Sequence, residues 1–207
     1  MDISTLVQDE RDEFVAFLAS LAPEQWDMPS LCTEWTVKQL ALHYLSLGET
    51  GPGGLVRALV ASGFSLDGAV NRLVAAREQR STGELVQQLR TLPTRSGLYR
   101  LFKPAGLLLE TFTHHQDARR PLGAAARDVP PERLTLVAET AVTSDGATGA
   151  KKRARGLRFE ATDIDWSHGD GPVVQGPAEA IVLTVTGRAA ALEDLSGQGT
   201  QMLASRL

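Results

Sequence analysis

The sequence has a single cysteine, Cys32, among its 207 residues. One cysteine excludes a disulfide framework and a cysteine-rich zinc motif. The sequence also has no uninterrupted apolar run that approaches the ~20 residues needed to span a bilayer. Its first residues, MDISTLVQDERDEF, lack a basic region followed by an apolar one, so we expect no signal peptide, no membrane partner and a cytoplasmic location.

An excess of positive charge is also missing. The formal net charge is −4 at pH 7 and the sequence pI is ≈ 5.6, so we expect no general attraction to nucleic acid. The composition, with 43% hydrophobic and 22% charged residues, is that of a globular protein that buries a core. No internal repeat is visible, and the sequence leaves open whether the protein is a monomer or a homodimer.

What is present is helical periodicity, which predicts a bundle over residues 1–125. Thr36 is suited to cap one of the helices, and Ser81 with Glu84 forms a capping-box pattern at the start of another. The helices are expected over 3–21, 37–49, 53–63, 66–80, 82–92 and 104–120.

The pattern changes after residue 125. Residues 126–156 contain the start of another expected helix, DVPPERL, and then a polar linker, SDGATGAKKRARG. Side chains of 157–166 alternate as in a strand, and helices are expected over 177–188 and about 198–207. We therefore predict a small α+β domain over 157–207.

One face of the expected helix 104–120 carries groups that can bind a metal ion. At about 100° per residue, Glu110, His114 and Asp117 fall on one stripe, whereas His115 points about 100° away. The adjacent histidines therefore cannot serve the same centre from an unbroken helix. Glu110 and His114, at positions i and i+4, can place an oxygen and a nitrogen on one ion.

A tight site needs a third ligand, and the best candidate is His43 on the flank of the apolar face of helix 37–49. Two histidines and a glutamate with an open fourth position are typical of catalytic zinc sites. The residues alone leave alternatives open. Most Glu-x-x-x-His pairs are solvated surface contacts, and a lone His43 is also typical of a hydrogen-bonded histidine at the edge of a core.

The charged residues near the C-terminal end of the expected helix 104–120 can serve either the site or only the helix. Asp117 either supports a ligand from behind or forms an ion pair with Arg120. Arg119, Arg120 and Arg127 either hold a carboxylate or offset the helix dipole.

Three further residues receive no role in the chemistry. We assign no metal to His115 or to His168, which is expected in an exposed turn. Nothing near Cys32 in the sequence activates its thiol, so a buried loop cysteine is favoured over a nucleophile.

Three segments of the chain carry a family resemblance. In order they are 26–43 (WDMPSLCTEWTVKQLALH), 110–123 (ETFTHHQDARRPLG) and 157–188 (LRFEATDIDWSHGDGPVVQGPAEAIVLTVTGR). In this order they resemble the mycothiol-dependent maleylpyruvate isomerase family, whose metal-binding domain belongs to the DinB/YfiT-like superfamily. The resemblance implies an α-helical DinB/YfiT-like four-helix bundle followed by a small α+β C-terminal domain.

The resemblance also implies ligands and cosubstrates. It implies a divalent metal, usually zinc (or nickel acquired during purification), held by His43, Glu110 and His114, the same trio that helical geometry favours. It implies mycothiol or another small thiol as cosubstrate. Gly187-Arg188 matches a family pair whose arginine contributes to catalysis, although Arg188 can also serve only to cap its own helix.

The chain departs from the family pattern in two places. The family's cysteine–proline–glycine–tryptophan loop is here Cys32-Thr33-Glu34-Trp35, and His115 stands where a small residue is commoner. Neither departure touches an expected ligand, and both leave the substrate open.

The function expected from the resemblance is a zinc- and thiol-dependent isomerase or S-transferase that acts on a small electrophilic substrate. Arg188, helped by Arg119 or Arg120, would hold a substrate carboxylate or stabilise enolate charge. One alternative is a metal-dependent hydrolase or amidase with Glu49 or Asp117 as base. The other is a non-catalytic member of the same fold that binds a small molecule.

Overall fold

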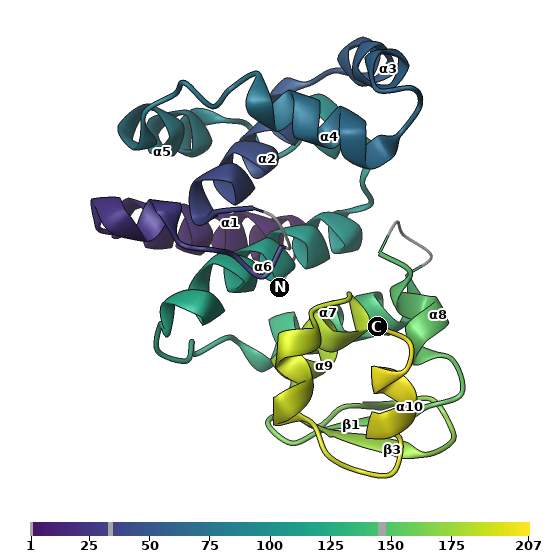
Figure 1. The fold of residues 1–207 in the computed structure, drawn as a ribbon. Helices are drawn as coiled ribbons and strands as arrows, with labels where there is room; N and C mark the ends of the chain where they lie inside the picture. The colour runs from purple at the N-terminus through teal and green to yellow at the C-terminus, as the bar shows by residue number, and fades with distance from the viewer. Residues whose placement is uncertain (1, 33–34, 145–147) are drawn as a thin grey trace. The chain divides into compact units, whose positions relative to one another are not determined.

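The computed structural model describes residues 2–32, 35–144 and 148–207 (Figure 1). These residues form two compact units, each considered separately below. The N-terminal unit comprises the chain up to Leu107 together with His114–Ala124, and the C-terminal unit comprises Leu108–Thr113 and Ala125–Leu207. No helix in the described part of the chain is both long enough and apolar enough to cross a membrane.

The N-terminal unit is helical. Its helices are α1 (Ile3–Ala19), α2 (Val37–Glu49), α3 (Pro52–Ala61), α4 (Leu66–Ala75), α5 (Thr82–Thr91) and both ends of α6 (Pro104–Arg119), whose middle, Leu108–Thr113, is counted with the C-terminal unit. Short 3-10 segments occur at η1 (Pro23–Asp27), η2 (Gly97–Leu101) and η3 (Arg120–Leu122). The two predicted caps are confirmed. Thr36 Oγ1 accepts from the N–H of Gln39 at 3.2 Å, and Ser81 Oγ accepts from the N–H of Glu84 at 3.3 Å.

Helix α2 supplies the centre of the core of this unit. Most of its side chains are buried, so it has no solvated face of the kind that a surface helix has. The ring of Tyr44 on α2 lies 5.4 Å from that of Phe14 on α1 and 5.2 Å from that of Tyr99 in η2. The hydroxyl of Tyr99 donates to the carbonyl of Tyr44 at 2.7 Å, which satisfies a polar group inside the core.

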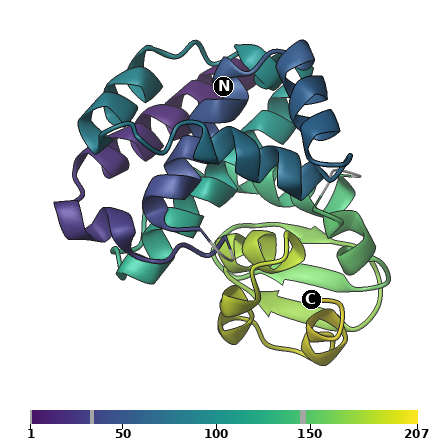
Figure 2. The same ribbon diagram turned by 45° about the horizontal axis from the view of Figure 1, so that its top comes forward.

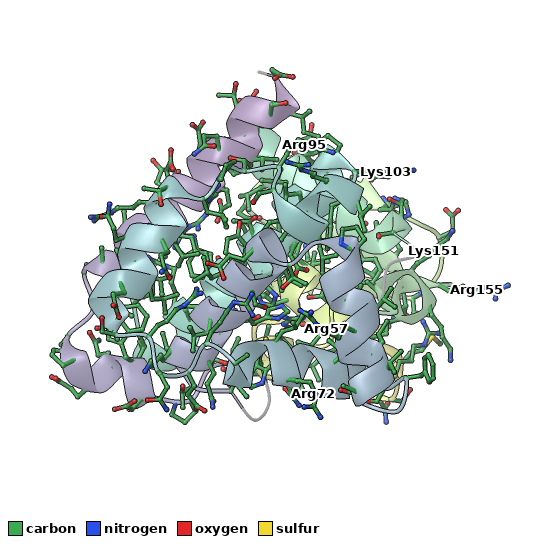
Figure 3. All side chains as sticks on the ribbon, turned by 90° about the horizontal axis from the view of Figure 1, so that it is seen from above. Arg57, Arg72, Arg95, Lys103, Lys151 and Arg155 are labelled. Carbon is green, nitrogen blue, oxygen red and sulfur yellow. The ribbon has the colours of Figure 1, made fainter. Side chains whose placement is uncertain are left out.

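The prediction of a helix over 66–80 is wrong at its C-terminal end, because α4 stops at Ala75. Beyond that residue the chain forms turns, in which the N–H of Arg77 donates to the carbonyl of Val74 at 2.9 Å. Within α4, Arg72 donates from Nη2 to the carbonyl of Ala61 at 3.0 Å and so holds the end of α3 (Figure 3).

The C-terminal unit joins helices to a three-stranded sheet. Its elements are α7 (Pro131–Thr143), α8 (Ala150–Ala154), β1 (Arg158–Ala161), β2 (Ser167–His168), β3 (Val173–Gly176), α9 (Ala178–Val185), η4 (Ala189–Asp194) and α10 (Thr200–Ala204). The strand order is β2-β1-β3. Strand β1 pairs parallel with β3 and antiparallel with β2, and Figure 2 shows β1 and β3 running side by side. Helix α9 packs against α7 and β1.

Two local predictions in this unit are wrong. Part of the predicted linker is helix α8, because Ala150 and Ala154, at i and i+4, are buried on one face, while Gly149 supplies a left-handed residue before it. Residues 145–147 of that linker lie outside the described residues. His168 was expected in an exposed turn, but it belongs to β2 opposite Phe159 and is about one-third exposed (34%).

The fold class is confirmed. A mostly helical unit is followed by a small sheet with helices, as the resemblance implies.

Candidate metal centre

Three of the predicted site residues come together. Glu110 and His114 lie one turn apart on α6, and His43 lies on α2. Each of these residues offers one ligand atom, and the three atoms lie within 4.8 Å of one another. His43 and His114 are 7% and 6% exposed, whereas Glu110 is partly exposed. The side chains that sequence geometry selected therefore face one small volume.

His114 is oriented by a neighbour on its own helix. Its Nδ1 lies 2.9 Å from Oδ2 of Asp117, which is fully buried. An ionised Asp117 carboxylate would accept a hydrogen bond from Nδ1, and a neutral His114 ring would then carry its lone pair on Nε2. A carboxylate behind a ligating histidine fixes the ring and makes the nitrogen more basic. The contact with His114 is the one expected if Asp117 supports a ligand from behind.

Aromatic packing fixes His43. Its ring lies 4.7 Å from that of Trp35 and 5.1 Å from that of His114, the latter in an edge-to-face arrangement. The indole of Trp35 is itself held by a hydrogen bond from Nε1 to Oδ1 of Asn71 on α4, at 3.0 Å. The loop before α2 therefore contributes a side chain that shields His43 from water. Thr33 and Glu34 in the same loop lie outside the described residues.

His115 has different surroundings from His114. Its Nδ1 lies 2.8 Å from Oε1 of Glu10 on α1, and both side chains are buried. Its ring packs against Phe14 at 5.2 Å and Phe17 at 5.8 Å. His115 therefore links α6 to α1 inside the core.

The arginines lie in varied places. The guanidinium of Arg119 lies 4.8 Å above the ring of Phe17, and that of Arg127 lies 5.4 Å above the ring of Phe112. Arg120 is half-buried at the C-terminal end of α6. In the C-terminal unit, Arg188 follows α9 and donates from Nη1 to the carbonyl of Thr186 at 3.0 Å. That contact agrees with the capping role.

Sequence reasoning missed the surroundings of Cys32. Its Sγ lies 3.0 Å from Oδ2 of Asp117 and 3.7 Å from Nδ1 of His114. Cys32 is half-buried rather than buried. The residues are 82 or more positions apart in the sequence, so no local pattern could have revealed the contact.

Glu49, one of the two bases considered for hydrolysis, is poorly suited to that role. Arg77 Nε lies 2.7 Å from one of its carboxylate oxygens and Arg80 Nη1 lies 2.9 Å from the other. Partial burial raises the pKa of Glu49, but the hydrogen bonds and charges of Arg80 and Arg77 outweigh this effect, so its pKa is lowered. A carboxylate held in its ionised form is a weak proton acceptor.

The donor set of His43, Glu110 and His114 fits a zinc-type ion. Bonds of about 2.0–2.2 Å in a tetrahedral site place donors about 3.4 Å apart. The separations here stay within 4.8 Å, so small side-chain rotations bring the atoms into range. Two nitrogens and one oxygen are the protein ligands typical of a catalytic site with an open position.

Comparison with known proteins finds a family model that is similar to part of the N-terminal unit. Residues 7–96 match the profile of the mycothiol maleylpyruvate isomerase N-terminal domain. The N-terminal region of the chain is thus similar to this family. Its matched residues include His43 and the Cys32 loop. No curated protein sequence matches the chain.

The fold likeness extends over nearly the whole chain. A crystal structure of the mycothiol-dependent maleylpyruvate isomerase aligns with a TM-score of 0.60 at 16% identity, covering 97% of this chain and 94% of that one. A histidine-to-alanine mutant of that enzyme aligns with a TM-score of 0.61, at the same identity and coverage. The shared fold therefore includes the elements of the C-terminal unit.

Proposed function

We propose that this chain is a divalent-metal-dependent enzyme that uses a small thiol of the mycothiol type to isomerise, or to attach the thiol to, a small electrophilic substrate. The observation that carries the proposal is the convergence of His43, Glu110 and His114 within a fold shared with mycothiol-dependent maleylpyruvate isomerase. Zinc is the metal that this donor set favours.

A bound divalent ion would lower the pKa of a thiol that reaches it, so that a thiolate is present at neutral pH. The chain's own residues prepare the position for such an ion. Asp117 keeps the hydrogen on Nδ1 of His114 and so leaves Nε2 for ligation. Trp35 covers the ring of His43 and reduces its access to water.

In the isomerase reaction the thiolate sulfur forms a bond to one carbon of a conjugated double bond, and the π electrons move to the carbonyl oxygen as an enolate. The former double bond is then single and rotates. When the enolate electrons return, the carbon–sulfur bond breaks and the thiolate leaves. In a transferase the carbon–sulfur bond persists and the enolate takes up a proton. We assign to Arg188, helped by Arg119 or Arg120, the role of holding a substrate carboxylate or stabilising the enolate charge.

The first experiment measures metal in protein purified without a histidine tag. We expect about one zinc ion per chain by elemental analysis. His114→Ala should remove it, because His114 is the most buried of the three ligands and is the one supported by Asp117. The matched control is His168→Ala, which removes a histidine from the other unit and should leave the metal content unchanged. Wild-type protein that binds no divalent metal would refute the proposal.

The second experiment tests the thiol. A thiol that binds only the folded protein, present at 100 times its Kd, raises the free energy of unfolding by about 2.7 kcal/mol. For a chain of this size that corresponds to a rise in Tm of roughly 5–10 °C. We expect this shift with mycothiol for the metal-loaded protein and its loss after chelation. Glu110→Gln should reduce it, and His168→Ala should not. A metal-loaded protein that shows no shift with any thiol, but hydrolyses amides or esters, would favour the hydrolase.

A further inference from the structure

A second set of groups that could hold a metal ion also includes His114. Cys32 Sγ lies 3.0 Å from Asp117 Oδ2 and 3.7 Å from His114 Nδ1, and these last two atoms lie 2.9 Å apart. One ligand atom from each of the three residues lies within 4.8 Å of the others. His114 therefore belongs to two groups of donors, one that includes His43 and Glu110 and one that includes Cys32 and Asp117.

The backbone holds this second group in place. The N–H of Leu31 donates to the carbonyl of Asp117 at 3.0 Å, which joins the cysteine loop to α6 one residue before Cys32. The hydroxyl of Ser30 donates to the carbonyl of Cys32 at 3.2 Å, and the N–H of Trp35 donates to the same carbonyl at 3.0 Å. Cys32 is thus fixed against the helix by its neighbours rather than carried on a free loop.

The donor chemistry and spacing suit a thiophilic divalent ion. Sulfur, imidazole nitrogen and carboxylate oxygen are all zinc ligands, and a tetrahedral zinc site separates such donors by about 3.3–3.7 Å. The Sγ–Nδ1 distance of 3.7 Å already matches. The two separations that involve Asp117, 3.0 and 2.9 Å, are hydrogen-bond lengths. They need to open by only about 0.5 Å when an ion replaces the shared hydrogens.

Occupation of the two positions is coupled through the ring. A neutral imidazole has one lone pair, and its other nitrogen carries the hydrogen. An ion bound through Nε2 leaves the hydrogen on Nδ1, next to Asp117. An ion bound through Nδ1 requires the hydrogen to lie on Nε2 and displaces the Cys32 thiol proton to solvent.

We propose that His114 serves two alternative cation positions: the one with His43 and Glu110, and a second, thiolate-ligated one formed by Cys32, Asp117 and Nδ1 of His114. The second position takes a zinc-type ion, and the chain's own thiolate is a ligand there. The proposal shares His114 with the proposed catalytic centre but does not depend on the thiol chemistry of that centre.

Cobalt(II) tests the second position directly, because a cobalt–thiolate bond gives a near-ultraviolet charge-transfer absorption that nitrogen and oxygen ligands do not give. In full-length His43→Ala protein, stripped of metal and titrated with cobalt, we expect this absorption. Adding Cys32→Ser should abolish it and weaken cobalt binding by at least about tenfold, since even the loss of a residue behind a ligand has an effect of that size. Glu110→Gln repeats the test if His43→Ala does not fold.

Two results would overturn the proposal. In the first, folded His43→Ala or Glu110→Gln protein binds cobalt but shows no thiolate absorption. In the second, the folded variant binds no cobalt. Circular dichroism establishes that each variant has native helix content. The single variant Cys32→Ser separates this test from that of the proposed function. If it binds no ion while His43→Ala shows the thiolate absorption, then the centre at His43 fails and the second position stands.

Discussion

The buried pair of Glu10 and His115 gives a prediction that separates structure from catalysis at two adjacent histidines. His115 is 1% exposed and Glu10 is 0% exposed, and their side-chain atoms lie 2.8 Å apart. His168 forms a similar pair with Glu139 at 3.3 Å, but the two side chains are 34% and 48% exposed. The same residue type therefore occurs in the same kind of contact in two different environments.

Burial decides the size of the effect. His115→Ala takes a hydrogen-bond partner from the buried carboxyl group of Glu10, and breaking a buried pair that includes a carboxylate costs about 3–5 kcal/mol. His115→Ala also removes a ring that packs on Phe14 and Phe17. An exposed pair contributes at most about 1 kcal/mol. We therefore expect His115→Ala to lower Tm by about 6–20 °C, and His168→Ala by no more than about 4 °C, for a chain of this size.

Urea denaturation followed by circular dichroism measures both free energies of unfolding, provided that the slope against urea concentration is unchanged. Glu10→Gln provides a third variant, in which the amide oxygen still accepts from Nδ1 of His115, and it should cost less than His115→Ala. Metal content per folded chain should be unaffected in all three variants. A loss below about 1 kcal/mol for His115→Ala would refute the argument from burial. A loss of metal from folded His115→Ala would refute the separation of the two histidines.

Three further predictions concern the N-terminal unit. Glu49→Gln should destabilise the protein by less than about 1 kcal/mol at neutral pH. Because the pKa of Glu49 is lowered on folding, this difference should disappear in urea titrations as the pH falls below the ordinary value of 4.5 and through the lowered pKa. Asp117→Asn should weaken metal binding by about 10- to 100-fold in a chelator competition assay. Gly97→Ala should cost at least about 2 kcal/mol in chemical denaturation, because φ there is +49° and a Cβ would overlap the carbonyl oxygen of Gly48.

The local signals of the sequence were reliable where one helix carries the information. The caps at Thr36 and Ser81 depend on neighbouring residues, and both are present in the structure. The separation of His114 from His115 follows from helical geometry alone, and the structure gives the two rings different partners. Predictions were wrong where the burial of a residue depends on a distant segment. The linker that contains helix α8 and the exposed turn at His168 are the two examples.

The sequence by itself determined the fold class, the family resemblance and the helical stripe of Glu110 and His114, because each depends on the order and spacing of residues along the chain. Only the tertiary structure decided what lies around that stripe. It placed His43 beside the helix, joined His115 to Glu10, and brought Cys32 to Asp117. Such contacts depend on which loops and helices pack together, since segments far apart in sequence meet only when the core forms.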